Sequence, residues 1–75
     1  MQALAGQVQA SLDGHSQIRV FKIQAQDTSD GVMLTGIVPS YYMKQVAGEI
    51  ALRIIRGRNE RLSNNITVQR QEMLV

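Results

Sequence analysis

The sequence predicts an α+β fold whose elements follow the order helix, strand, strand, helix, strand (αββαβ). Apolar residues recur at helical spacing in two segments and alternate with polar residues in three others, and clusters of turn residues separate these segments. We expect a three-stranded mixed sheet with both helices packed on one of its faces. A length of 75 residues is that of one small domain.

The two helical segments are the first and fourth elements. The first is expected from Gln2 to Leu12, and Asp13-Gly14 ends it. The second is expected from Tyr41 to Arg56, with Ser40 as its N-cap and Gly57 as its C-terminal stop. Their apolar stripes are Leu4, Ala5, Val8 and Leu12 in the first and Met43, Val46, Ala47, Ile50 and Ile54 in the second.

The other three segments are expected to be strands. Residues 18–25 are rich in β-branched and aromatic types, and a change of phase in their alternation predicts a bulge near Val20-Phe21. A hairpin loop over 27–31 leads to a second strand from Val32 to Val38, which Pro39 ends. The third strand places Leu62, Asn64, Ile66 and Val68 on one face and Ser63, Asn65, Thr67 and Gln69 on the other.

The composition argues against several classes of chemistry. The chain has no cysteine and one histidine, so neither a disulfide nor a Cys/His zinc site is expected, and no cofactor is predicted. The first fifteen residues show neither the basic nor the apolar region of a signal peptide, and no run approaches the roughly 18 apolar residues of a spanning helix. The residues alone leave the compartment undetermined, and a cytoplasmic location is compatible with them.

Short motifs that look like catalytic or ligand sites fit turns better. Asp13-Gly14-His15-Ser16 holds an acid, an imidazole and a hydroxyl, but catalytic triads converge from separate segments, so we interpret it as a polar turn. Asp27 and Asp30 lack the further oxygen ligands of a calcium loop. Gly31 and Gly36 match two glycines of a phosphate-binding loop without the Lys-Ser or Lys-Thr that should follow. We therefore predict that the protein is not an enzyme, and the few aromatic residues also argue against nucleic acid as a partner.

A cluster of basic residues is the first candidate for a binding surface. The arginine cluster consists of Arg53, Arg56, Arg58 and Arg61, which fall within nine residues and are opposed there only by Glu60. Such a cluster favours phosphate-bearing partners. A solvated helix end followed by an arginine-rich turn explains it equally well, so both interpretations stay open.

An apolar strip on the flank of the second helix is the other candidate. The strip consists of Tyr41, Gly48, Leu52 and Ile55. Packing against the first helix is the preferred interpretation, because Gly48 would let that helix approach closely. If Leu52 is exposed instead, the strip becomes a surface for self-association or membrane contact.

The stretch GVMLTGIVPS, residues 31–40, resembles the signature of the BON domain family, a small bacterial module. That signature reads glycine, apolar, any residue, leucine, small hydroxyl, glycine, any residue, valine, and its positions here are Gly31, Leu34, Gly36 and Val38. Ala47 and Ala51 in the second helix and the closing run 62–68 agree with the family, and Gly57 matches the glycine after that helix. Arg58 stands where the family usually has valine. The resemblance predicts one domain over 1–69 and a tail over 70–75.

The resemblance implies a non-catalytic module that binds phospholipid or membrane surfaces, located in the periplasm or cell envelope. On that basis the arginine cluster is expected to contact anionic headgroups weakly and in a salt-sensitive manner. The alternative is a protein-interaction or oligomerisation module that uses Tyr41, Leu52 and Ile55 or a sheet edge.

Gly36 faces the core, and we expect it to let a helix approach the second strand.

Overall fold

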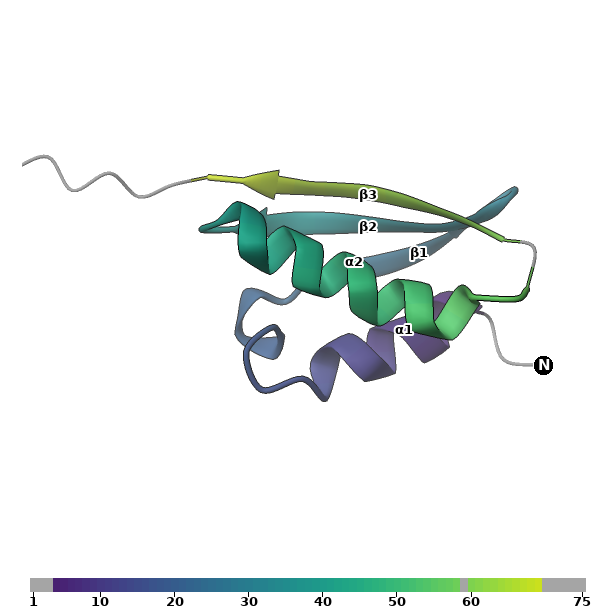
Figure 1. The fold of residues 1–75 in the computed structure, drawn as a ribbon, viewed down its shortest axis with the longest axis horizontal. Coiled ribbons are helices and arrows are strands. Elements are labelled where there is room, and N and C mark those ends of the chain that lie inside the picture. Colours follow the sequence, from purple (N-terminus) through teal and green to yellow (C-terminus); the bar gives the residue numbers. More distant parts are fainter. Residues whose placement is uncertain (1–3, 59, 70–75) are drawn as a thin grey trace, which may run out of the picture.

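The computed structural model describes residues 4–58 and 60–69. Its elements are helix α1 (Leu4–Asp13), the short 3-10 helix η1 (Arg19–Phe21), strands β1 (Gln24–Thr28) and β2 (Gly31–Val38), helix α2 (Tyr41–Ile55) and strand β3 (Arg61–Val68). This order confirms the predicted αββαβ fold, with η1 as an addition (Figure 1). The predicted tail over 70–75 and the first residues of the predicted first helix lie outside the described residues.

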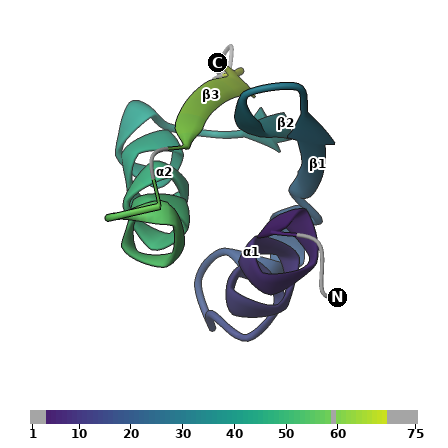
Figure 2. The same ribbon diagram turned by 90° about the vertical axis from the view of Figure 1, so that its right-hand side faces the viewer.

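The three strands form one mixed sheet in the order β1-β2-β3. β1 runs antiparallel to β2, whereas β3 runs parallel to β2, from the pair Gly31 and Arg61 to the pair Val38 and Val68. A parallel neighbour needs a crossover connection, and α2 provides it. Both helices lie on the same face of the sheet, α1 beside β1 and α2 beside β3 (Figure 2).

The core lies between this face and the two helices. Its buried side chains come from both helices, from β2 and β3, and from the connection between α1 and β1. They are Ala5, Val8, Leu12, Ile18, Ile23, Val32, Leu34, Val38, Ala47, Ala51, Ile55 and Ile66. The alternation predicted for β2 and β3 therefore faces the helices as expected.

The buried face of α2 is shifted from the predicted stripe. Its buried positions are Ala47, Gly48, Ala51 and Ile55, whereas the larger side chains of the stripe at Met43, Val46, Ile50 and Ile54 are only half-buried. The small side chains allow α2 to lie close to β3, and the large ones fill the space at the side of the helix. Size complementarity rather than hydrophobicity alone thus decides which face meets the sheet.

The segment before β1 differs from the predicted strand. Arg19–Phe21 form one turn of 3-10 helix, and Lys22 adopts the left-handed conformation with a φ of 52°. This turn buries both Ile18 and Ile23, while Val20 is 65% exposed. The predicted bulge is therefore wrong, because the change of phase in the sequence marks a 3-10 turn after which β1 begins.

The hairpin between β1 and β2 is tighter than the loop predicted over 27–31. Thr28 still belongs to β1 and pairs with Gly31, so only residues 29–30 form the turn. The Thr28 hydroxyl donates a hydrogen bond of 3.2 Å to the carboxylate of Asp30 across this turn. Strand pairing thus continues as far as the chain reversal allows.

The two signature glycines of β2 have different physical reasons. A Cβ atom at Gly31 would overlap the backbone of Arg61, so the start of β3 fits against β2 only where no side chain is present. Gly36 has a φ of 145°, and a Cβ atom there would lie 3.3 Å from the Cα and Cγ1 atoms of Ile23. The expectation that Gly36 makes room for a helix is therefore wrong, because its neighbour is the residue that precedes β1.

The edge of β1 that faces away from β2 is covered by α1. The carboxamide of Gln9 accepts the backbone N–H of Ala25 at 2.8 Å and donates to the carbonyl of Ile23 at 2.8 Å. The backbone N–H of Ala5 donates to the carboxylate of Asp27 at 3.0 Å. One glutamine side chain therefore makes the pair of bonds that a neighbouring strand would make.

Candidate functional site

Helix α2 carries most of the candidate residues, and local signals fix both of its ends. At the start, the Ser40 side chain accepts the backbone N–H of Met43 at 3.3 Å, which confirms the predicted N-cap. At the end, the Arg56 backbone leaves the helical conformation with φ −59° and ψ 131°. Gly57 follows with a φ of 81°, the position at which many helices end in glycine.

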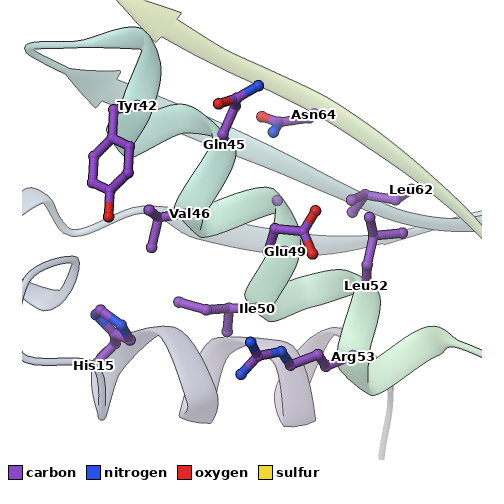
Figure 3. A pocket seen from close by; sticks show the side chains of 11 residues that line it. His15, Tyr42, Gln45, Val46, Glu49, Ile50, Leu52, Arg53, Leu62 and Asn64 are labelled. Atoms are coloured by element: carbon purple, nitrogen blue, oxygen red, sulfur yellow. The ribbon is translucent and has the colours of Figure 1, made fainter.

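The arginine cluster lies on the segment that joins α2 to β3. Arg53 is in the last turn of α2, Arg56 is its C-cap, Arg58 lies in the turn, and Arg61 is the first residue of β3. All four residues are exposed. The four arginines are thus exposed on one connection, although Arg53 is still within α2 and points toward α1 (Figure 3), whereas the other three follow the end of α2.

Arg61 interacts with Asp30 in the hairpin turn through both its backbone and its side chain. Its backbone N–H donates to the carbonyl of Asp30 at 2.9 Å, and its Nε atom lies 4.0 Å from the Asp30 carboxylate. Both side chains are well exposed, so this ion pair contributes little to stability. Asp30 nevertheless adds a negative charge beside the arginine cluster, which the sequence alone does not indicate.

A groove of about 610 Å³ runs along the outer side of α2. Its wall on α2 includes Tyr42, Gln45 and Leu52, and β3 contributes Leu62 and Asn64 (Figure 3). Most of this wall was not among the predicted site residues. The groove forms between elements that are distant in the sequence, so no local pattern indicates it. Of its lining, the sequence suggests only that Leu52 could be exposed, as the alternative to packing against the first helix.

The predicted apolar strip on α2 does not form one surface. Tyr41 and Leu52 are exposed, at 61% and 38%, but Ile55 belongs to the core and Gly48 is buried. A Cβ atom at Gly48 would lie 2.8 Å from the side-chain nitrogen of Asn64, so Gly48 faces β3. The expectation that this glycine admits the first helix is therefore wrong.

Asn64 links β3 to α2 within the groove wall. Its side-chain amide donates to the backbone carbonyl of Lys44 at 3.1 Å, and its side-chain oxygen accepts the backbone N–H of Ile66 at 3.3 Å. A polar residue on the helix-facing side of a strand is thereby satisfied at both of its polar atoms.

The turn after α1 forms one end of the groove. His15 is half-buried there, and its Nδ1 atom accepts the backbone N–H of Gln17 at 3.3 Å. The Asp13 carboxylate instead accepts from the side chain of Gln9 at 3.2 Å. The acid and the imidazole thus have different partners, which fits the interpretation of residues 13–16 as a polar turn.

Two general features concern residues 4–58 and 60–69. Within these ranges, no group of three or more His, Cys, Asp or Glu side chains is arranged to hold a metal ion. None of the helices described there has the length and apolar character needed to cross a membrane.

Comparison with known proteins gives one match. The family model of the BON domain matches residues 2–70, a span that includes every helix and strand of the fold. A search of curated proteins gave no significant match, and neither did a search of solved structures. The signature glycines Gly31 and Gly36 also occupy positions where the backbone requires glycine. The chain therefore belongs to the BON domain family, a family of non-catalytic binding modules.

Proposed function

We propose that the chain is a module that binds anionic membrane surfaces weakly through the arginine cluster. The observation that supports this function is the exposure of all four arginines on one connection, from the last turn of α2 to the first residue of β3. Guanidinium groups bind phosphate well, because their donors match its oxygens. The family assignment is consistent with a partner of this kind.

The local charge limits the strength of this binding. Four arginines less Glu60 and Asp30 leave a net charge of two positive units around the connection. At about 1 kcal/mol for each basic residue near an anionic surface, one copy gains about 2 kcal/mol. Binding by a single copy is therefore weak and sensitive to salt, and stable attachment needs several copies or a second anchor.

Vesicle co-sedimentation tests the proposal. The protein should sediment with vesicles that contain phosphatidylserine and not with pure phosphatidylcholine, and added salt should release it. Arg56→Gln/Arg58→Gln should reduce the bound fraction. The matched control is Arg19→Gln/Lys22→Gln, which removes the same charge from exposed positions on and beside η1. Equal losses in both variants, or binding that ignores lipid charge, would contradict a role for the arginine cluster.

The second candidate is a protein-interaction module that uses the outer side of α2. The observation that favours it is the exposure of Tyr41, Tyr42 and Leu52 on this helix, at 61%, 62% and 38%. Sedimentation velocity over a concentration series tests the version in which the partner is a second copy. A sedimentation coefficient that rises with concentration and falls back in Leu52→Ser supports self-association, and one that stays constant in the wild type argues against it.

A further inference from the structure

The two edges of the sheet differ in whether another element covers them. The edge of β1 is covered by α1, because Gln9 bonds to Ile23 and Ala25. The outer edge of β3, the one that faces away from β2, has no strand paired with it in the described part of the chain. Between Leu62 and Val68 the strand contains no charged residue and no proline, the residues that usually prevent an edge from pairing.

The backbone register shows which groups the outer edge offers. The N–H groups of Arg61 and Gln69 donate to the carbonyls of Asp30 and Val38, so odd-numbered residues of β3 direct their backbone groups toward β2. In a parallel pair these directions alternate along the strand. The even-numbered residues therefore direct their N–H and C=O groups to the outer edge. They are Leu62, Asn64, Ile66 and Val68, of which Ile66 already donates its N–H to the side-chain oxygen of Asn64.

The groove lies directly beside this edge. Helix α2 extends past β3 on the side of the outer edge (Figure 2). Gln45, Glu49 and Leu52 on α2 and Leu62 on β3 line the space between them (Figure 3). A strand added next to β3 would run over α2 and direct every second side chain into the groove. Backbone hydrogen-bonding groups thus occur beside a groove that offers both apolar side chains, Leu52 and Leu62, and polar ones, Gln45 and Glu49.

We infer that the outer edge of β3 binds an extended segment of a partner protein, which becomes a fourth strand of the sheet. The segment carries apolar side chains at alternate positions, because these meet Leu52 and Leu62. It carries an acidic residue at the end beside Arg56, Arg58 and Arg61, whose three positive charges exceed the two negative charges of Glu60 and Asp30. Main-chain bonds supply the affinity and the groove supplies the selection, as in other cases of strand addition.

A second copy of this fold does not fit the same place. Its β1 edge is covered by its own α1, through the equivalent of the Gln9 contacts. Pairing of β3 with β3 across a two-fold axis would place both copies of α2 in the same space, because each extends past its own strand (Figure 2). The occupant is therefore a segment that has no helix packed beneath it. The inference refines the second proposed function and does not depend on membrane binding.

The test uses a synthetic peptide as the probe and nuclear magnetic resonance as the readout. The peptide has the eight-residue length of β3, alternates valine with threonine and ends in aspartate. Titration should slow amide hydrogen exchange at Leu62, Asn64 and Val68. The amides of Ser63 and Asn65 already belong to the ladder with β2 and should change little. A peptide N-methylated at alternate residues should not bind, because it lacks the required donors.

Variants of the protein separate the groove from the edge. Leu52→Glu should weaken peptide binding about tenfold, because its carboxylate would lose water under the added strand. Val20→Glu is the matched control, since Val20 is an exposed apolar residue on η1, and it should leave binding unchanged. Circular dichroism of both variants checks that the fold is retained.

Three outcomes would overturn the inference. They are no protection of the amides of Leu62, Asn64 and Val68 at millimolar peptide, equal affinity in Leu52→Glu and wild type, and protection that depends on protein concentration without peptide. The last outcome would show that a second copy occupies the edge, which supports self-association but not peptide binding. Vesicle binding by the same samples is scored separately, so failure of one proposal does not count against the other.

Discussion

The side-chain amide of Asn64 on β3 fills the space beside Gly48 of α2, where a Cβ atom would lie 2.8 Å from its nitrogen. The same nitrogen donates to the backbone carbonyl of Lys44, one helical turn before Gly48. The hydrogen bond between β3 and α2 can form because Gly48 has no side chain that would occupy the place of the Asn64 amide. This contact connects the last strand to the rest of the core.

The pair Gly48 and Asn64 should show strong coupling in a double-mutant cycle. In an Asn64→Ala background, Gly48→Ala should stabilise the protein by about 1 kcal/mol, because alanine favours a helix. In the wild type that gain should vanish or reverse, since the new methyl group displaces the amide from Lys44. Urea unfolding of the four proteins measures the coupling, expected at about 1 kcal/mol. Additive effects would show that the amide moves aside without cost.

Gly31 should tolerate no side chain, whereas Gly6 should. Gly31→Ala places a methyl group on the backbone of Arg61 and should destabilise the fold by about 3 kcal/mol or more, because both strands must separate. Gly6 lies on the exposed side of α1 with nothing within 4 Å of its Cβ position, so Gly6→Ala should stabilise by up to about 1 kcal/mol. Thermal unfolding of both variants checks the contrast, and similar melting temperatures would refute it.

Gly36 should be sensitive to size and to backbone conformation together. Its φ of 145° is rarely adopted by residues with a side chain, and Ile23 is only 3.3 Å from the Cβ position. We expect Gly36→Ala to cost about 2 kcal/mol and Gly36→Val to cost more. Adding Ile23→Val should recover part of the loss in Gly36→Val if crowding contributes. No recovery in chemical denaturation would leave the backbone as the sole cause.

Gln9 should protect the edge of β1. Gln9→Ala leaves the N–H of Ala25 and the carbonyl of Ile23 without the carboxamide, and should destabilise the fold by about 2 kcal/mol. Gln7→Ala on the same helix is the control and should change stability by less than about 0.5 kcal/mol. Hydrogen exchange at the Ala25 amide should accelerate in Gln9→Ala alone. Slow exchange there in both variants would mean that α1 covers the edge without this side chain.

The elements that the sequence predicts well are those whose pattern repeats along one face. β3 alternates through eight residues, β2 buries Val32, Leu34 and Val38 on one face, and α2 has both a cap and a terminal glycine, so local signals agree with tertiary burial. The segment before β1 was misassigned because its β-branched residues favour a strand locally. In the folded protein a 3-10 turn between Ile18 and Ile23 allows both side chains to be buried. This burial depends on tertiary packing, which the local sequence does not show.

The candidate site was predictable only where one segment contains it. The arginine cluster is contiguous, and its exposure follows from its position at a helix end. The groove is not contiguous in the sequence, because Tyr42 and Asn64 come to line the same groove only after β3 pairs with β2. The prediction that α1 packs against Gly48 is wrong for the same reason. No local pattern indicates that the residue next to Gly48 is Asn64 of β3.

The parallel pairing of β2 with β3 has a consequence for biosynthesis. The central strand receives its second neighbour only after the whole of α2 has crossed over, and the pair Gly31 and Arg61 is thirty positions apart in sequence. Until Ile66 leaves the ribosome, the nascent chain carries α2 without the strand that covers its small residues. A chain ended at Ile55 should therefore show no cooperative thermal transition. The pace of translation over the last strand then determines how long an apolar β2, paired with β1 on one edge only, is available to chaperones.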